Sequence, residues 1–367
     1  MAEKIVSPGV FTNEIDQSFL PATAGPIGAA IVGPTVKGPI LEPTVVSSYS
    51  EYVQVFGELI ESGSDKFQYL TSHAAQEYLR QGGPLTVVRV GEPSLDKASA
   101  SVFAYPGSGS SAFDLEVIGN GPSFNSSSSL ESNGRLSPLG TSATNDHFSS
   151  GSFGGRADNF RYEISQRNLA KGTFTLVLRQ GNDETSKKKV IETFENLSLD
   201  PESPNYILKR IGNQTTSIVV EDNQAFVQQT GEFPNKSKNI RVKNLNLKTP
   251  NYLKEDGTID SSVYGTGANY IPLLGSGSGG GAFDGGDFGS SQILHPFNFY
   301  LAEDNDTNSQ GVKLATSAAT LGTGGYKTAI NLLKNKDEFD IDLLFLPGIL
   351  DQNGTNSNTI IGDAIQM

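Results

Sequence analysis

Two short apolar runs near the start of the chain have the character of buried strands. Residues 27 to 32 are almost continuously apolar and are followed by Gly33 and Pro34, which end a strand. Residues 85 to 90 repeat this pattern. Runs without polar alternation are typical of strands whose two faces are both covered, as in parallel sheets. We therefore predict two neighbouring strands of one covered sheet.

The residues between these two runs predict two helices. Ser48, followed three residues later by Glu51, resembles a capping box, and Gly57 ends the helix that it opens. A second helix is predicted from Asp65 to Gln81, with Gly82 as its terminator. Its apolar stripe would consist of Phe67, Leu70, Ala74 and Tyr78. A strand, two helices and a strand predict an α/β sheet covered on at least one face.

The region from residue 92 to residue 289 has a different pattern. Strand-like runs occur at residues 160–165, 173–179, 217–221 and 239–247. Segments 107–112 and 120–155 are rich in Ser, Gly and Asn, and we expect a flexible loop excursion over 107–155. Residues 275–289 contain eight glycines and predict a second flexible loop. The region is therefore predicted to be a β-rich domain inserted into the α/β domain.

The α/β pattern returns after residue 290. Residues 326 to 333 predict a helix with Tyr326, Ile330 and Leu333 on one face, and residues 340 to 346 predict a strand closed by Pro347 and Gly348. Residues 359 to 367 have the pattern of a helix that has only begun. We therefore expect an α/β domain made of 23–91 and 290–367, whose second part is truncated.

The first 22 residues form a separate unit, which we interpret as an extended arm. Ser7, Pro8 and Gly9 predict a turn, and the following strand-like segment places Phe11 and Ile15 on one face. No hairpin partner follows. Such a strand can cover its own domain or pair with a sheet edge of a neighbour, and periodicity alone slightly favours the first choice.

Charge and composition exclude several classes of function. The net charge is −13, whereas a nucleic-acid binder needs a surplus of Lys and Arg on one face. The basic run Lys187–Lys189 is interpreted as a solvated hairpin flank. There is no cysteine, so disulfides, thiolate metal sites and thiol nucleophiles are excluded. The N-terminus lacks the pattern of a signal peptide, and no apolar run approaches 18 residues, so we expect neither secretion by that route nor membrane insertion.

The motifs that could carry chemistry are incomplete. The GxGxxG match at 275–280 is not followed by a helix, and the glycine-rich segment 322–328 lacks the preceding strand of a P-loop. Asp304, Asp306 and Asn308 have the spacing of a calcium loop without its later glycine and glutamate. The histidines are far apart in sequence, at positions 73, 147 and 295. We predict no catalytic residue, no cofactor and no metal site.

Several short blocks follow one another in a recognisable order along the chain. The first blocks are Ser7-Pro8-Gly9-Val10 with Glu14, Gly25–Ala29, Val32–Pro34, Gly38-Pro39, Phe56-Gly57 and Leu85–Arg89. The later blocks are Asn196–Gly212, Phe283-Asp284-Gly285 and Phe339–Gly348. Together these blocks resemble contractile-tail sheath proteins of T-even-like (myovirus) bacteriophages. Two departures matter. Residues 107–155 match nothing in that family, and its members continue beyond Met367 into a further domain that faces the tail tube.

The resemblance implies a structural protein rather than an enzyme. Its copies would form hexameric rings stacked around the tail tube and contract to drive the tube through the host envelope. It implies an α/β inner domain of subtilisin-like topology, an inserted outer β domain, and an arm that pairs with neighbouring subunits. The arm residues are Ser7, Pro8, Gly9, Val10, Phe11, Asn13, Glu14, Ile15 and Asp16. The implied partners are copies of itself and the tube, baseplate and tail terminator proteins, in the host cytoplasm during assembly and then in the virion.

Three alternatives remain open. A bacterial contractile injection particle would use the same kind of sheath. A serine hydrolase would need His73 or His295 with a distant Ser and Asp, and would react with a fluorophosphonate probe. A glycan-binding virion module would be built on residues 92–289, and a glycan array would detect it.

Overall fold

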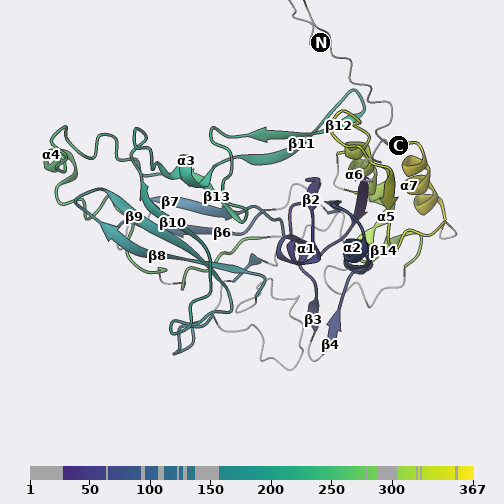
Figure 1. Ribbon diagram of the computed structural model, residues 1–367, viewed down its shortest axis with the longest axis horizontal. Coiled ribbons are helices and arrows are strands. Elements are labelled where there is room, and N and C mark those ends of the chain that lie inside the picture. Colours follow the sequence, from purple (N-terminus) through teal and green to yellow (C-terminus); the bar gives the residue numbers. More distant parts are fainter. Residues whose placement is uncertain are drawn as a thin grey trace, which may run out of the picture.

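The computed structural model shows an elongated molecule with two lobes (Figure 1). The structure describes residues 28–62, 65–91, 96–105, 111–121, 124–126, 130–136, 157–277, 279–286, 304–319, 321–322, 325–351 and 354–367. One lobe, which we call the α/β lobe, combines residues 28–91 with residues 304–367. The other, the β lobe, is built from residues 96–286. The predicted arm and most of the predicted loop excursion lie outside the described residues.

A four-stranded sheet forms the centre of the α/β lobe, with the strand order β16-β1-β5-β2. These strands are β16 (Leu343–Phe345), β1 (Ala29–Gly33), β5 (Leu85–Arg89) and β2 (Thr44–Val46). β1 is parallel to both of its neighbours, whereas β2 is antiparallel to β5. The strands predicted near 27–32, 85–90 and 340–346 are confirmed, although β16 is shorter than its prediction.

Both faces of this sheet are covered. Alternate residues of β1 point to opposite sides, so Ile31 joins the core under α1 (Tyr49–Phe56) and α2 (Leu70–Gln81). Val32 joins the second core, with residues from α5 (Leu314–Ala319), α6 (Tyr326–Leu333) and α7 (Thr355–Ile365). Coverage on two sides explains why the strands read as continuous apolar runs.

The predicted helix at residues 48–57 is confirmed. Ser48 is the N-cap of α1, and its Oγ accepts a hydrogen bond of 3.2 Å from the backbone N–H of Glu51. The Glu51 carboxylate accepts from the backbone and side chain of Ser47 rather than from Ser48. Gly57 ends the helix with φ +76°, a value that favours glycine. The later helix at 326–333 is confirmed with the same bounds as α6.

The helix predicted over 65–81 is wrong in its first part. Asp65–Phe67 is a strand, β4, which pairs with β3 (Ile60–Ser62), and α2 begins only at Leu70. The predicted stripe is right for Ala74 and Tyr78, which pack against the core, and wrong for Leu70, which is 46% exposed. The fully buried positions of α2 are Thr71, Ser72 and Ala75. A polar side chain can face this core because the hydroxyls of Ser72 and Tyr52 lie 2.8 Å apart and share a hydrogen bond.

Two three-stranded antiparallel sheets form the β lobe. One has the order β10-β9-β8, with β8 at Phe160–Asn168, β9 at Thr173–Gln180 and β10 at Val190–Ser198. The other has the order β13-β7-β6, with β6 at Ser99–Val102, β7 at Phe113–Val117 and β13 at Ile240–Leu245. The rings of Phe113 and Phe174 stack between the sheets with centroids 5.8 Å apart. The short helices α3 (Ile207–Ile211) and α4 (Ser261–Tyr264) complete the lobe.

The prediction of a flexible loop over 275–289 is wrong for its described part. Gly275 and Ala282 form β-bridges with residues of β8, and Asp284 forms one with Ser99 of β6. Phe283 is fully buried in the β-lobe core. At Gly281, where φ is +78°, an added Cβ would lie 2.0 Å from the Tyr162 carbonyl oxygen. Glycine is required here because the segment packs directly against the β8 backbone.

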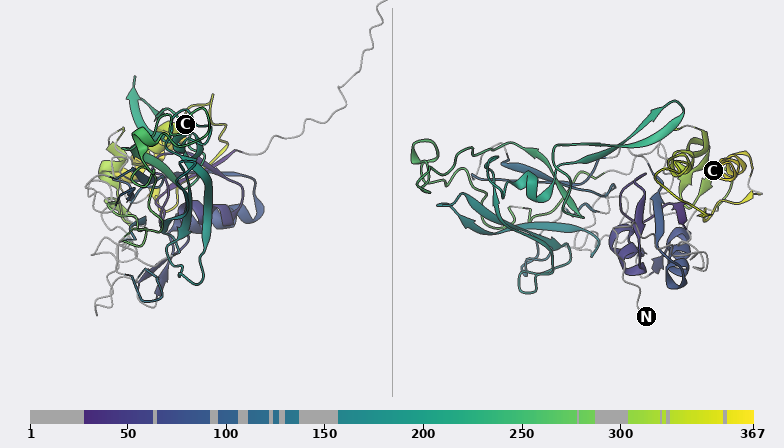
Figure 2. Two further views of the ribbon diagram at one scale, coloured as in Figure 1. Left: turned by 90° about the vertical axis from the view of Figure 1, so that its left-hand side faces the viewer. Right: turned by 45° about the horizontal axis from the view of Figure 1, so that its top comes forward.

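A β-hairpin from the β lobe extends across to the α/β lobe (Figure 2). It consists of β11 (Thr215–Glu221) and β12 (Gln224–Thr230), which pair along their whole length. At its tip, Ala225 is buried in the α/β core, and its N–H donates to the Asn331 Oδ1 of α6 at 2.6 Å. We call this hairpin the strap, because it connects the two lobes away from their main junction.

Candidate functional site at the junction of the two lobes

Arg89 connects the two lobes at the end of β5. Its Nη1 donates to the Gly38 carbonyl at 2.6 Å and to the Asn120 carbonyl, on the β-lobe side, at 2.8 Å. Removal of the guanidinium from water lowers the pKa of Arg89 to about 10, because burial disfavours the charged form. The group stays charged at neutral pH and holds two backbone carbonyls from different lobes.

Further contacts strengthen this junction. Asn120 donates its N–H to the Gly38 carbonyl at 3.0 Å, and its Oδ1 accepts from the Ile40 N–H at 3.3 Å. Lys37, 5% exposed, pairs with Asp158 at 3.2 Å. Gly38 has φ +109°, and a Cβ there would meet the Phe56 ring at 2.8 Å. The junction is therefore a tight backbone-to-backbone contact that depends on a glycine.

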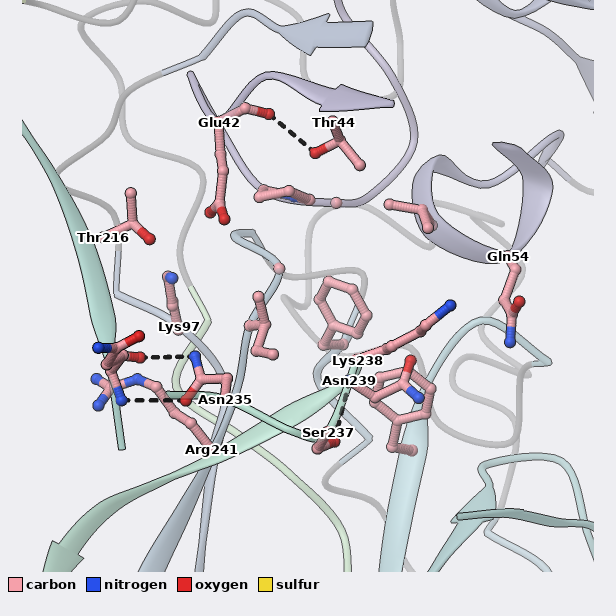
Figure 3. A pocket seen from close by; sticks show the side chains of 18 of the residues that line it. Glu42, Thr44, Gln54, Lys97, Thr216, Asn235, Ser237, Lys238, Asn239 and Arg241 are labelled. Atoms are coloured by element: carbon pink, nitrogen blue, oxygen red, sulfur yellow. Dashed lines mark hydrogen bonds between the residues drawn. The ribbon is translucent and has the colours of Figure 1, made fainter. Parts of the chain in front are cut away.

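A cavity of about 570 Å³ lies beside this junction, between the lobes. Figure 3 shows Gln54 on the α1 side and Lys97 and Arg241 on the β-lobe side. The polar side chains around it are those of Glu42, Thr44, Glu51, Gln54, Lys97, Gln214, Thr216, Gln229, Asn235, Ser237, Lys238, Asn239 and Arg241. Phe124 and Phe160, whose ring centroids are 5.4 Å apart, form part of the apolar lining. We call this cavity the junction pocket.

The carboxylate of Glu116, next to the pocket-lining residue Arg241, interacts with several cations. The Glu116 side chain accepts from Arg241 through Oε2 and pairs with Lys243 through Oε1 at 2.9 Å. Burial lowers the pKa of the Lys97 amine, while the nearby charges of Glu116 and Glu42 oppose that shift. Lys97 makes no hydrogen bond or ion pair with the part of the chain that the structure describes. Among the described residues, the charges of Glu116 and Glu42 act on this ammonium from a distance.

A second charged cluster braces the inside of the β lobe. Asp183, 1% exposed, receives both Nε and Nη2 of Arg179, at 2.6 and 2.9 Å, and Nη1 of Arg161 at 3.3 Å. Arg179 also pairs with Glu163 at 2.6 Å, as does Lys188. Burial raises the pKa of the Glu163 carboxyl, but these two cations outweigh it, and the pKa lies below its ordinary value. The sequence showed these residues only as ordinary strand charges.

The arm residues predicted to carry subunit contacts cannot be compared with this site. Positions 7–11 and 13–16 lie outside the described residues. Within the described ranges, each of the three larger sheets has two edge strands, which are β16 and β2 in the α/β lobe and β10, β8, β13 and β6 in the β lobe. Isolated β-bridges connect β8 and β6 to residues 275–284. Edge strands of this kind offer unpaired backbone groups to an added strand.

Asp304 and Asp306, which have the spacing of a calcium loop, accept backbone hydrogen bonds instead. The Asp306 carboxylate accepts from the backbone N–H of Asn356 at 2.7 Å and of Ser357 at 3.3 Å. This cap starts α7 at Thr355, four residues before the predicted start. Asp304 accepts from the Gln310 N–H at 2.7 Å, and burial raises the pKa of its carboxyl. Among the described residues, no cluster of His, Asp and Glu has the geometry of a metal site.

The remaining predicted candidates are dispersed. His73 is exposed on α2, and the other two histidines lie outside the described residues. Lys187–Lys189 forms the exposed flank of the β9–β10 hairpin, as predicted. In the described ranges, no helix combines the length and apolar character needed to cross a bilayer. The junction pocket itself had no sequence signal, because its walls come from segments almost 200 residues apart.

Comparisons with known proteins find a likeness to several solved structures, among them two sheath tail proteins. No protein-family model matches the chain, and no curated protein does. A sheath tail protein from Listeria innocua is 9% identical, with a TM-score of 0.26 over 60% of this chain and 34% of that one. A sheath tail protein from Desulfitobacterium hafniense is 12% identical, with a TM-score of 0.25 over 70% of this chain and 41% of that one. The chain thus corresponds to well under half the length of either structure.

Proposed function

We propose that this chain is a structural subunit of a contractile tail sheath of the T-even-like kind. The observation that carries the proposal is where the resembling sequence blocks lie in the fold. The blocks at 32–34, 85–89 and 339–348 contribute to three adjacent strands of one sheet, with Ala29 opposite both Leu85 and Leu343. Blocks that are distant in sequence therefore belong to one structural unit, which is more specific than scattered short matches.

The junction supports a mechanical role. Arg89 and the strap connect the lobes at two separate places. A subunit braced in this way can be moved as one body, which a contracting sheath requires of its parts. We propose that copies form hexameric rings stacked around a tail tube, and that contraction drives the tube through the host envelope. Contacts of the heterologous type, which do not close on themselves, would extend such rings into a helix.

The proposed linkage between subunits is the arm, Ser7 to Asp16. A lone strand with an apolar face can add to an exposed sheet edge by backbone hydrogen bonding. The edge strands β16 and β10 are two of the possible acceptors among the described residues. The tube, baseplate and tail terminator proteins are the further proposed partners, in the virion and, during assembly, in the host cytoplasm. The inner and outer placement of the lobes and the subtilisin-like topology belong to the same proposal.

The test is assembly of the full-length protein with and without its arm. We expect the intact protein to form striated cylinders in negative-stain micrographs. Deletion of residues 1–20 should leave a folded monomer by circular dichroism and sedimentation, because in this proposal the arm pairs with neighbouring subunits rather than with its own lobes. Long cylinders from the truncated protein would rule out the arm model. Absence of cylinders from the intact protein, under all salt conditions, would count against the sheath proposal itself.

Point variants sharpen this test. Phe11→Asp combined with Ile15→Asp puts charge on the apolar face of the predicted strand and should prevent polymerisation. Thr12→Asp changes the opposite face by one charge and serves as the matched control, which should still polymerise. If both variants behave alike, the arm does not act through a strand with one apolar face.

A further inference from the structure

The junction pocket has the size and composition of a small-molecule site. Its volume of about 570 Å³ falls within the range of roughly 300 to 1,000 Å³ that is usual for ligand pockets. Its walls come from both lobes, with Glu42 and Gln54 from the α/β lobe and Lys97 and Thr216 from the β lobe (Figure 3). Gln229 of the strap also lines the pocket. A molecule bound here would contact both lobes at once.

Several polar groups in the pocket are unused. Among the described residues, the side-chain amides of Gln54, Gln214 and Gln229 and the hydroxyl of Thr216 make no hydrogen bond with the protein. The Asn235 amide, in contrast, is fixed by the backbone of Gln214, from which it accepts at 3.0 Å and to which it donates at 2.8 Å. The free amides can therefore donate to and accept from a ligand that carries hydroxyl or carbonyl groups.

The charge balance of the pocket favours an anion. Both oxygens of Glu116 are already engaged by Arg241 and Lys243, so this carboxylate cannot also pair closely with Lys97. The charged side chains that line the pocket are three cations, Lys97, Lys238 and Arg241, and two carboxylates, Glu42 and Glu51. This local surplus of positive charge is unusual for a chain whose net charge is −13. Lys97 is partly buried and has no carboxylate at ion-pair distance among the described residues, so an anionic ligand would compensate its charge.

We propose that the junction pocket binds a small organic anion, with the carboxylate or phosphate of the ligand on the Lys97 ammonium and its hydroxyl groups on the free glutamine amides. The ligand class is a polyhydroxylated acid or a sugar phosphate. This inference does not depend on the sheath proposal, since it rests on the geometry of one subunit. Binding would stabilise the arrangement of the lobes, because the ligand binds only when both walls are in place.

The first test is calorimetric titration of the full chain at low ionic strength. The probes are glucose 6-phosphate, glucuronate, citrate and inorganic phosphate, with uncharged glucose as the neutral comparison. We expect saturable binding of at least one organic anion and none of glucose. Comparison of glucuronate with glucose 6-phosphate distinguishes a carboxylate ligand from a phosphate ligand. Failure of every probe to bind the folded protein would overturn the proposal.

A lysine variant connects the binding to this pocket. Lys97→Gln should weaken the affinity by about tenfold or more, because a charge-assisted hydrogen bond is lost. Lys254→Gln is the matched control, since Lys254 is exposed in the β lobe and does not line the pocket. Equal binding by the wild type and Lys97→Gln would place the anion elsewhere and refute the assignment. If the wild type bound none of the small anions and Lys97→Gln lost self-association, an acidic segment of a second copy would be the occupant and the small-ligand proposal would be wrong.

A second readout avoids dependence on the folding of a variant. Acylation of lysines by an amine-reactive reagent, followed by mass spectrometry, reports the accessibility of each amine in the unmodified protein. A bound anion should slow acylation of Lys97 and leave the rate at Lys254 unchanged. Equal protection of both lysines, or of neither, would contradict binding at the pocket.

Discussion

The two lobes differ in how their cores are built and stabilised. The α/β lobe covers a short sheet on both sides with helices, and its sheet joins segments from the two ends of the described chain. The β lobe is continuous in sequence and combines one apolar core with buried charges, centred on Asp183. Long-range strand pairing thus stabilises one lobe, whereas hydrogen-bonded ion pairs and local hairpins contribute to the other. Each lobe should therefore respond to a different kind of change.

The largest effect should come from Asp183→Asn in the β lobe. The substitution removes the negative charge that pairs with the buried guanidinium groups of Arg161 and Arg179. Breaking a buried ion pair in this way typically costs about 3 to 5 kcal/mol of stability. Thermal and urea unfolding would measure it, with hydrogen exchange to locate the loss in the β lobe. The control is Glu77→Gln, which removes an exposed ion pair with Arg80 and should cost under about 1 kcal/mol. Equal effects at the two sites would contradict the bracing role of the cluster.

A smaller effect, in the other lobe, is expected for Gly28→Ala. A Cβ at this position would lie 1.6 Å from the Asp340 carbonyl oxygen, so β16 would have to move away from β1. We expect a loss of about 1 to 3 kcal/mol, as for other overpacked sites. Hydrogen exchange should then increase in β1 and β16 and stay unchanged in the β lobe. Gly83→Ala, where a Cβ meets nothing within 4 Å, is the control, and a comparable loss there would refute this explanation.

Asn331→Ala tests the connection between the lobes. The change removes the acceptor of the buried Ala225 N–H and should cost about 1 kcal/mol. Exchange should increase at the tip of the strap while both cores keep their protection. Lys327→Ala on the same helix controls for the change in helix propensity. No local difference between the two variants would mean that the strap is held by its apolar contacts alone.

The smallest and most gradual effect is that of acid. Glu163 and Asp114, both in the β lobe, have pKa values below their ordinary values of 4.5 and 3.8, because hydrogen bonds and cations outweigh the cost of burial. Their stabilisation is fully present above the ordinary pKa values and is lost as the pH falls below them. In the α/β lobe the pKa of Glu51 is lowered but that of Asp304 is raised, so their contributions change with opposite signs. Hydrogen exchange between pH 5 and pH 3 should therefore show that the β lobe loses protection first. Earlier loss in the α/β lobe would contradict this assignment.

The sequence predicted well those elements whose signals are local. α6 has both predicted bounds because a glycine precedes it and its buried residues recur at helical spacing. The cap of α1 was likewise visible in Ser48 and Glu51. The start of α2 was wrong because Asp65–Phe67 has helix-compatible residues, and only its pairing with β3 makes it a strand.

Other features depend on contacts that no local pattern encodes. The strands β10 and β12 were missed because polar residues dominate their exposed positions. The glycines of 275–286 indicated flexibility, although several of them allow close packing against β8. The junction pocket, the Arg89 contacts and the Asp183 cluster arise where distant segments meet, so their residues look ordinary in the sequence. The inferred function relied on ordered sequence blocks rather than on any site residue.

The pairing of β1 with β16 has a consequence for protein synthesis. Gly28 and Asp342, which hydrogen-bond beside these strands, are 314 residues apart. At a translation rate of about 5 to 20 residues per second, β1 waits about 15 to 60 s for its partner. The β lobe leaves the ribosome during that interval and can fold first, while one side of β1 is still open. Completion of the α/β sheet is thereby delayed until the segment that contains β16 has been made.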